Sequence, residues 1–440
     1  MKVNQSVYQQ RRQAVLQKIG TDGIAIVFAA PEQRRSNDTE YPFRQDSYFH
    51  YLTGFPETES ALILNGQEQS ATLLCRHKDP DAEIWHGFRY GPAAAREQFK
   101  FDQADDISQL TQHLKKALPG HRQLYALWGL YPQRDTQMIA LWNEINQITN
   151  HHSIPGSTIA SENLINLSSI LDPMRLVKDE HEQSLMRIAA EISAQAHIRA
   201  MRNTKPGKYE YQIEAEILHE FMLHGARYPA YNSIVAGGKN ACCLHYVRNS
   251  DQLQASDLLL IDAGAEYQMY AGDISRTFPV SGRFTSAQKD VYDIVLAVNQ
   301  ASIDATVNQA DWQIIASNAT RMLTEGMIDL GILQGSVEEN IDKQLYRRFY
   351  MHGLGHWLGL DVHDVGGRFD HQGQPILLQP GMVTTIEPGI YIAAADDIPA
   401  AFHHIGIRIE DNILVTENGN ENLTASVPKT TSAIETIMQQ

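Results

Sequence analysis

The stretch Leu260-Ile-Asp-Ala-Gly-Ala-Glu-Tyr-Gln-Met-Tyr-Ala-Gly-Asp273 joins an apolar strand that ends in a carboxylate to a second carboxylate eleven residues later. If Tyr267-Gln268 forms a two-residue turn, antiparallel pairing places Asp262 directly opposite Asp273, with Cβ atoms roughly 4.5–5.5 Å apart. Two ionised carboxylates at that distance repel each other unless a proton or a cation lies between them. The turn lacks an Asn-Gly signature, so a longer loop or a bulge could shift the register. Taken alone, each acid is better explained as a solvated residue at a strand end or a turn.

Two later segments repeat this arrangement. Thr385-Ile-Glu-Pro-Gly389 places a carboxylate, Glu387, after an apolar strand, and Ile405-Gly-Ile-Arg-Ile-Glu410 carries another. Because the isoleucines alternate with the other residues, Arg408 and Glu410 share one face of their strand. Together with the two aspartates above, four acids take strand positions where an apolar core face is expected. Carboxylates buried in such numbers are tolerated only when they are paired or bound to metal, and Arg408 can neutralise only one of them.

A third motif contributes histidines. The segment Met351-His-Gly-Leu-Gly-His-Trp-Leu-Gly-Leu-Asp-Val-His363 places His352 and His356 four residues apart. The intervening Gly353-Leu-Gly355 has poor helix propensity and lacks a glutamate, so this pair is not predicted to form the helical zinc site of a zincin. A single histidine is more often structural than a ligand, but three in a segment interrupted by glycines favour a functional site.

The charges of these residues favour a site for two divalent metal ions. Two such ions bring four positive charges, which match the four carboxylates and leave one imidazole as a neutral ligand. Sites rich in oxygen with a single nitrogen favour Mn²⁺, with Co²⁺, Fe²⁺ or Zn²⁺ as competitors. Two ions about 3.5–4 Å apart can share a bridging water, lower its pKa and stabilise the developing oxyanion.

Composition limits the classes of function. The chain has 440 residues, of which 43% are hydrophobic and 20% charged, and this indicates a soluble globular protein of two domains. A formal charge of −16 without a Lys/Arg cluster argues against nucleic-acid binding. No apolar run reaches the about 18 residues of a membrane span or resembles a signal-peptide core, so we expect a cytoplasmic protein. Cys75, Cys242 and Cys243 fit neither a zinc spacing nor a disulfide framework, which favours buried, reduced thiols.

The chain is predicted to divide near Leu171-Asp172-Pro173, because proline disfavours helix in the residue before it. Residues 1–172 alternate between strands and helices and contain no dense cluster of potential ligands, which predicts an α/β scaffold domain. Its expected elements are strands at 23–28, 61–64, 71–75 and 124–128 and a helix at 136–148. Residues 173–440 predict an α+β catalytic domain of helices packed on a largely antiparallel, curved sheet. Its expected helices carry the apolar rows Leu185-Ile188-Ile192-Ala196, Ile213-Ile217-Phe221 and Val291-Ile294-Val295-Val298, and a capping box of Thr285 and Gln288 opens the last of them.

The set of motifs resembles the pita-bread metallopeptidases, which include methionine aminopeptidase, prolidase and aminopeptidase P. Asp-Ala-Gly with a second aspartate eleven residues on, His-Gly-x-Gly-His, Glu-Pro-Gly and Gly-x-Arg-x-Glu-Asp all occur in the family's order. The resemblance covers essentially the whole chain, and segments 40–55, 225–235 and 417–424 are similar to the bacterial aminopeptidase P branch. It implies a pita-bread catalytic domain whose metal ligands are Asp262, Asp273, His356, Glu387 and Glu410.

The resemblance also implies roles for residues around the metals. His245 and His363 are expected to hold the substrate carbonyl and the gem-diolate. Glu387 is expected to accept a proton from the nucleophilic water while it ligates metal. Arg408 and His352 are expected to support the reaction from outside the metal shell.

Three further features bear on substrate binding and assembly. Tyr391 is expected beside the site. Trp85, in Ala82-Glu-Ile-Trp-His-Gly87, resembles a residue that reaches the active site of a neighbouring subunit, which implies a homo-oligomer, a tetramer or a dimer. A buried core aromatic explains Trp85 equally well. The stretch Gly367–Pro375 is longer than the family's arginine-bearing loop, and only Arg368 remains as a possible counterpart, so the contacts of this loop stay open.

The function implied is release of the N-terminal residue from peptides with proline at the second position, by attack of a metal-bridging hydroxide on the Xaa-Pro carbonyl. Prolidase is the closest rival, because it shares the metal ligands but accepts only dipeptides, and cleavage of a tripeptide such as Gly-Pro-Leu distinguishes the two. Two metal-free hypotheses, a binding module and a creatinase-like amidinohydrolase, are less favoured, since all five ligand positions are filled.

Overall fold

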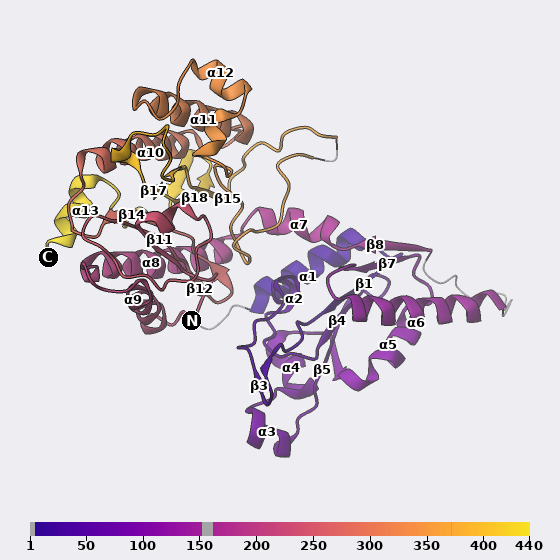
Figure 1. The fold of residues 1–440 in the computed structure, drawn as a ribbon. Coiled ribbons are helices and arrows are strands. Elements are labelled where there is room, and N and C mark those ends of the chain that lie inside the picture. Colours follow the sequence, from indigo (N-terminus) through magenta and orange to yellow (C-terminus); the bar gives the residue numbers. More distant parts are fainter. Residues whose placement is uncertain (1–4, 152–161, 371) are drawn as a thin grey trace. The chain divides into compact units, whose positions relative to one another are not determined.

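The computed structural model describes residues 5–151, 162–370 and 372–440, and the chain forms two compact units, residues 1–173 and 174–440 (Figure 1). The division falls one residue after the expected boundary, and each unit has its own hydrophobic core. Within the described ranges, no helix is both long enough and apolar enough to cross a membrane.

The N-terminal unit is built on a six-stranded mixed sheet in the order β6-β5-β4-β1-β7-β8. The predicted strand at 23–28 and the predicted hairpin are confirmed as β1 and the antiparallel pair β4 and β5. The other predicted strand ends at Ala126, two residues early, and the predicted helix lies within the longer α6, which begins at Pro132. Alternate residues of β1 point to opposite faces, so that Ile24 and Ile26 pack with Leu114 and Met138 beneath α5 and α6. The elements are α1 (Gln5–Ile19), β1 (Gly23–Phe28), β2 (Arg34–Ser36), β3 (Thr39–Glu40), α2 (Ser47–Thr53), β4 (Ala61–Asn65), β5 (Ser70–Cys75), α3 (Pro80–His86), α4 (Gly91–Phe99), β6 (Gln103–Asp106), α5 (Leu110–Ala117), β7 (Gln123–Ala126), α6 (Pro132–His151) and β8 (Asn163–Asn166).

Helix α7 (Ser168–Leu176) runs through Pro173, so the expectation that this proline disfavours helix before it is wrong. A proline inside a helix removes one backbone donor and crowds the carbonyl four residues earlier. Here Leu171 and Leu176, on either side of the proline, are both buried. Their burial favours a continuous helix over a break at Pro173.

The C-terminal unit places helices on both sides of short antiparallel strands, with α10, α11 and α12 on one side and α8 and α9 on the other (Figure 1). The predicted capping box is confirmed, because Thr285 and Gln288 each bond the other's backbone N–H at the start of α10. The helices are α8 (Glu180–Asn203), α9 (Glu210–Leu223), α10 (Ser286–Ala305), α11 (Trp312–Asp329), α12 (Val337–Asp342) and α13 (Thr431–Met438). The strands are β9 (Tyr228–Pro229), β10 (Ile234–Gly237), β11 (Leu258–Asp262), β12 (Ala265–Tyr267), β13 (Tyr270–Ala271), β14 (Ser275–Pro279), β15 (Val383–Ile386), β16 (Gly389–Ile392), β17 (Ile405–Arg408), β18 (Asp411–Thr416) and β19 (Gly419–Asn422).

The register around the first two acids differs from the prediction. Tyr267 pairs with Tyr270, so that the two-residue turn is Gln268-Met269, one residue later than expected, and both of its residues have positive φ. Asp262 therefore pairs with Ser275 and not with Asp273. A turn displaced by one residue shifts the pairing by two, and because side chains alternate with a period of two, both acids stay on one face as diagonal neighbours.

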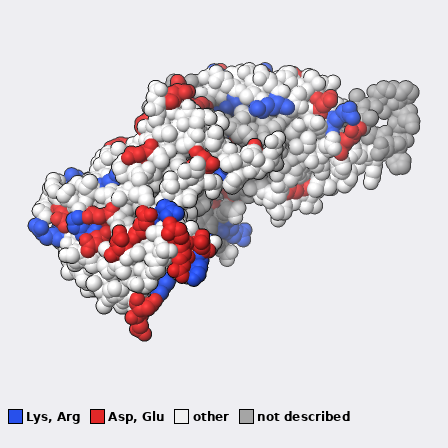
Figure 2. Space-filling view, turned by 90° about the horizontal axis from the view of Figure 1, so that it is seen from above, with Lys and Arg blue, Asp and Glu red and all other residues white. Residues whose placement is uncertain are grey.

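Surface charge is mixed. On the face shown in Figure 2, acidic and basic side chains of the described residues are interspersed, and no continuous basic patch is seen there.

Candidate metal centre

The five predicted ligands meet in one cavity of about 590 Å³, although they come from segments far apart in the sequence. Ligand atoms of Asp273, His356 and Glu410 all lie within 4.8 Å of one another. His356 Nε2 is 3.4 Å from Asp273 Oδ2 and 3.7 Å from Glu387 Oε1. Asp262, at the end of β11, lines the same cavity.

Hydrogen bonds between segment 273–275 and segment 410–412 position the acids. The Glu410 N–H donates to the carbonyl of Ser275 at 3.0 Å, and the Ser275 hydroxyl donates to Glu410 Oε2 at 2.7 Å. Asn412 bonds both backbone groups of Asp273, since its Oδ1 accepts from the Asp273 N–H at 3.0 Å and its Nδ2 donates to the Asp273 carbonyl. The two segments therefore present the carboxylates of Asp273 and Glu410 to the same space.

The histidine segment is not helical, as predicted, and it is fixed against β15. The N–H of Thr385 donates to the His356 carbonyl at 2.9 Å, and the His356 N–H donates to the Thr385 hydroxyl at 3.0 Å. A Cβ on Gly355 would lie 2.0 Å from the Thr385 carbonyl oxygen, so this close approach requires glycine. Nδ1 of His356 lies 3.0 Å from the carbonyl of Trp357, and a proton donated there leaves Nε2 facing the acids as an acceptor.

Burial and neighbouring charges perturb the pKa values of this group. Burial raises the pKa of Glu387 to about 7, against the opposing charge of His356. Burial, followed by the charges of Asp273 and Glu387, raises the pKa of Glu410 well above its usual range. For Asp273, burial and the charge of Asp262 raise the pKa in spite of His356. Burial alone would lower the pKa of His356, but Asp273 and Glu387 raise it to about 9. Buried carboxylates held together in this way fit divalent cations.

A row of hydrogen-bonded side chains, from Arg408 through Tyr391 to His352, lies beside the acids. Arg408 donates to Asp262 Oδ2 at 2.7 Å, to the Ser275 hydroxyl at 2.8 Å and to the Tyr391 hydroxyl at 2.9 Å. The Tyr391 hydroxyl lies 2.8 Å from His352 Nε2. Arg408 therefore contacts Asp262, although it shares a strand face with Glu410.

His245 and His363 line the same cavity outside the group of ligand atoms. The ring centroids of His356 and His363 are 4.1 Å apart. Burial, followed by the charges of His356 and His245, lowers the pKa of His363. Both imidazoles thus face the space where a group bound at the metals would lie.

Tyr231 was not predicted as a site residue. Its hydroxyl lies 2.5 Å from Oδ1 of Asp262 and 2.5 Å from Oδ1 of Asp273, so it links the two acids. It belongs to segment 225–235, whose similarity to the family carried no residue assignment. Only the contact itself identifies Tyr231.

The structure shows the surroundings of Trp85 and Arg368, whose roles the sequence left open. Trp85, on α3, is 83% exposed, so the expectation of a buried core aromatic is wrong. Arg368 lies between two indole rings, with its guanidinium carbon 3.7 Å from the centroids of both Trp312 and Trp357, and it donates to the Thr384 hydroxyl at 3.1 Å. Burial lowers the pKa of Arg368 to about 9. The side chain of Arg368 is thus part of the packing behind His356.

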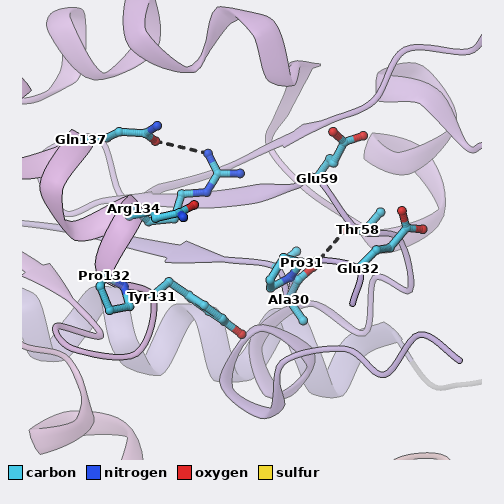
Figure 3. Close-up of a pocket in the computed structure, with 11 residues that line it drawn as sticks. Ala30, Pro31, Glu32, Thr58, Glu59, Tyr131, Pro132, Arg134 and Gln137 are labelled. Atoms are coloured by element: carbon cyan, nitrogen blue, oxygen red, sulfur yellow. Dashed lines mark hydrogen bonds between the residues drawn. The ribbon is translucent and has the colours of Figure 1, made fainter. Parts of the chain in front are cut away.

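A separate hollow of about 760 Å³ lies in the N-terminal unit, between the segments that follow β1 and β7 (Figure 3). Its charged residues are Glu32, Glu59 and Arg134, and Arg134 donates to Gln137 at 3.4 Å. Within the described residues, the group of potential metal ligands lies in the C-terminal unit and not here.

The fold and the site together define a metal-dependent hydrolase with an α/β domain followed by an α+β catalytic domain. A family model for metallopeptidase family M24 matches residues 184–417, and one for the N-terminal domain of aminopeptidase P matches residues 8–125. The chain belongs to metallopeptidase family M24. The expected enzyme class, a metallo-aminopeptidase, is confirmed.

Individual relatives match along the whole length. The chain is 45% identical to the Xaa-Pro aminopeptidase of Haemophilus influenzae, over 99% of this chain and 98% of that protein. It is 44% identical to the Xaa-Pro aminopeptidase of Escherichia coli, with the same two shares. The structure of Escherichia coli aminopeptidase P with the inhibitor Pro-Leu superimposes with a TM-score of 0.95 at 43% identity, covering 100% of this chain and 99% of that one. The predicted pita-bread fold is therefore confirmed.

Proposed function

We propose that this enzyme releases the N-terminal residue from peptides that have proline at the second position, and that it uses two divalent metal ions. The observation that carries the proposal is the convergence of four carboxylates and the imidazole of His356, all five predicted ligands, in a single cavity. The full-length similarity to Xaa-Pro aminopeptidases supports the choice of substrate.

The donor set fits the proposed metals. Asp262, Asp273, Glu387 and Glu410 supply oxygen, and His356 supplies one nitrogen, which favours Mn²⁺. Arg408 pairs with Asp262, and the His356 ring lies 3.4 Å from Asp273, so the four carboxylates still outnumber the positive groups beside them and need further positive charge. When bound, the metals would supply an acidified water and polarise the substrate carbonyl.

The protein's own groups then have separate tasks. Glu387 faces the cavity with its backbone N–H held by the Leu354 carbonyl at 2.8 Å, and we assign it the acceptance of the water's proton. His245 and His363 are assigned to the substrate carbonyl oxygen and to the tetrahedral gem-diolate. The row from Arg408 through Tyr391 to His352 holds Asp262 and one wall of the cavity in place.

This arrangement suits the Xaa-Pro bond. That bond is a tertiary amide without an N–H, so a site that grips the amide hydrogen cannot hold it. A site that grips the carbonyl oxygen and the free α-amino group does not need that hydrogen. The carboxylates that line the cavity offer hydrogen-bond acceptors for the free α-amino group.

The exposed side chain of Trp85 and the three cysteines bear on assembly and on cellular location. Trp85 and its neighbours Ile84 and Phe88 are largely exposed, and we propose that Trp85 contacts a second copy in a homo-oligomer, a tetramer or a dimer. Cys75, Cys242 and Cys243 are all free thiols, although only Cys75 is fully buried and Cys243 is exposed, so the expectation of three buried thiols is wrong. We propose that the protein is located in the reducing cytoplasm, where free thiols persist.

Hydrolysis of Gly-Pro-Leu before and after chelation tests the function. We expect release of glycine, loss of activity with EDTA, and recovery with Mn²⁺ as two metal equivalents rebind. Activity confined to the dipeptide Gly-Pro would assign the protein to prolidase. Activity that survives removal of all metal would overturn the proposal.

A further inference from the structure

A buried carboxylate lies behind the metal centre and is not part of it. Glu210, the first residue of α9, is 0% exposed. Its Oε1 accepts from the Gly237 N–H at 2.8 Å and from Asn240 Nδ2 at 3.0 Å. Its Oε2 accepts from the Tyr246 hydroxyl and from the Asp251 N–H, each at 2.8 Å. All four donors are neutral, so hydrogen bonds compensate the buried group.

The four donors are spread along one segment of chain, residues 237–251. Gly237 ends β10, Asn240 lies in the short 3-10 helix Gly238–Cys242, and Asp251 closes the segment. The Glu210 N–H also donates to the Asp251 carbonyl at 3.0 Å. Residues 246–250 belong to no helix or strand, so side-chain contacts largely determine the path of the chain there.

The same segment carries His245 into the metal cavity. Tyr246, which follows it directly, is one of the four donors to Glu210. In the parts of the chain that the structure describes, the His245 ring makes no hydrogen bond of its own. The place of the ring therefore depends on the backbone that Glu210 holds.

We propose that Glu210 is a positioning residue for catalysis, which fixes segment 237–251 and thereby holds His245 against the substrate. This inference rests on the role proposed above for His245. Glu210 touches no reacting atom, so its effect passes through the histidine. The competing explanation is that Glu210 only stabilises the fold.

The substitution Glu210→Gln tests this with little change in side-chain volume. An amide accepts at one atom only, so two of the four donors would face an NH₂ group. We expect kcat for Gly-Pro-Leu to fall by about tenfold to 100-fold, because a small displacement of a catalytic group is costly. KM and the content of two metal equivalents should change little, since His245 acts on the reacting carbonyl.

A double-mutant cycle separates positioning from general stabilisation. In a His245→Ala background, Glu210→Gln should lower kcat by less than about twofold, because the group it positions is gone. If Glu210→Gln lowers kcat in the His245→Ala background by the same factor as in the wild type, the inference is overturned. Full activity of His245→Ala itself would instead overturn the assignment of His245, and with it this dependent role.

Two further variants complete the test. Tyr246→Phe removes one of the four hydrogen bonds and keeps the ring, so it applies even if Glu210→Gln fails to fold. It should lower kcat by a smaller factor, and that loss should vanish in the His245→Ala background. Glu182→Gln is the matched control, because Glu182 is buried on α8 and accepts from the Tyr270 hydroxyl at 2.9 Å. It should lower the melting temperature and leave kcat unchanged.

Discussion

The substitution Asp273→Asn should stabilise the metal-free protein and weaken the stabilisation that bound metal provides. Asp273 is 4% exposed, and its backbone groups are both bonded by Asn412, so an isosteric amide leaves the local fold intact. In the metal-free protein, burial and Asp262 raise the pKa of Asp273, which means that its ionised form is disfavoured on balance. Removal of that charge therefore stabilises the metal-free protein.

The distances give the size of this effect. Oδ1 of Asp262 and Oδ1 of Asp273 each lie 2.5 Å from the Tyr231 hydroxyl oxygen, so the two are at most about 5 Å apart. Two unit charges about 5 Å apart at an effective dielectric constant of about 20 repel by about 3 kcal/mol. Loss of the contact between Asp273 and His356, at 3.4 Å, offsets part of this gain.

Bound metal should oppose this stabilisation of the variant. Loss of a group that only supports a metal ligand weakens metal affinity by about tenfold to 100-fold, so loss of a carboxylate ligand itself should weaken it by at least about tenfold. Metal at about 100 times its dissociation constant stabilises the wild type by about 2.7 kcal/mol per site, and a tenfold weaker affinity leaves the variant about 1.4 kcal/mol of this. Activity should be abolished.

Calorimetric melting with EDTA and with Mn²⁺, alongside metal analysis, measures both effects. The variant should melt above the wild type in EDTA, and Mn²⁺ should raise its melting temperature by less than it raises that of the wild type. Retained cleavage of Gly-Pro-Leu with two bound metals would refute the ligand assignment. A variant that melts below the wild type in EDTA would refute the charge argument alone.

Replacement of His245 or His363 by alanine should lower kcat by about 100-fold while metal content stays at two equivalents. Elemental analysis checks this, and loss of a full equivalent would show that the residue is a ligand. Acetylation of Gly-Pro-Leu at its N-terminus should abolish cleavage, because the acidic cavity then lacks an ammonium group to bind. Product analysis by chromatography decides this, and an undiminished rate would exclude an exopeptidase. Burial would raise the pKa of Asp364, but Lys178 and Arg175 lower it, with Lys178 Nζ 3.0 Å and Arg175 Nη2 2.6 Å away. The resulting stability is present above the ordinary aspartate pKa of about 3.9 and is lost as pH falls through the lowered value. Asp364→Asn should therefore flatten the acid limb of melting temperature against pH, and an unchanged slope would contradict the linkage.

Local patterns in the sequence were sufficient for most of the fold and for the grouping of the ligands. The apolar run at 23–28 and the hairpin at 61–75 are local features that propensity and turn chemistry describe well. The face shared by Asp262 and Asp273 survived an error in the turn, since strand side chains repeat every two residues. The continuous helix through Pro173 was missed, because burial of its flanking leucines is not a local property.

The sequence by itself determined which side chains could hold metal, because strand periodicity and charge are carried by the order of residues alone. Only the tertiary structure decided how they are held. Tyr231 meets the two aspartates from 31 and 42 residues away, and Arg408 reaches Asp262 across 146 residues. The burial of Arg368 between two indoles and the hold of Glu210 on the His245 segment are likewise long-range. Such contacts depend on how elements pack, and no spacing along a single chain specifies which distant side chain will fill a given gap.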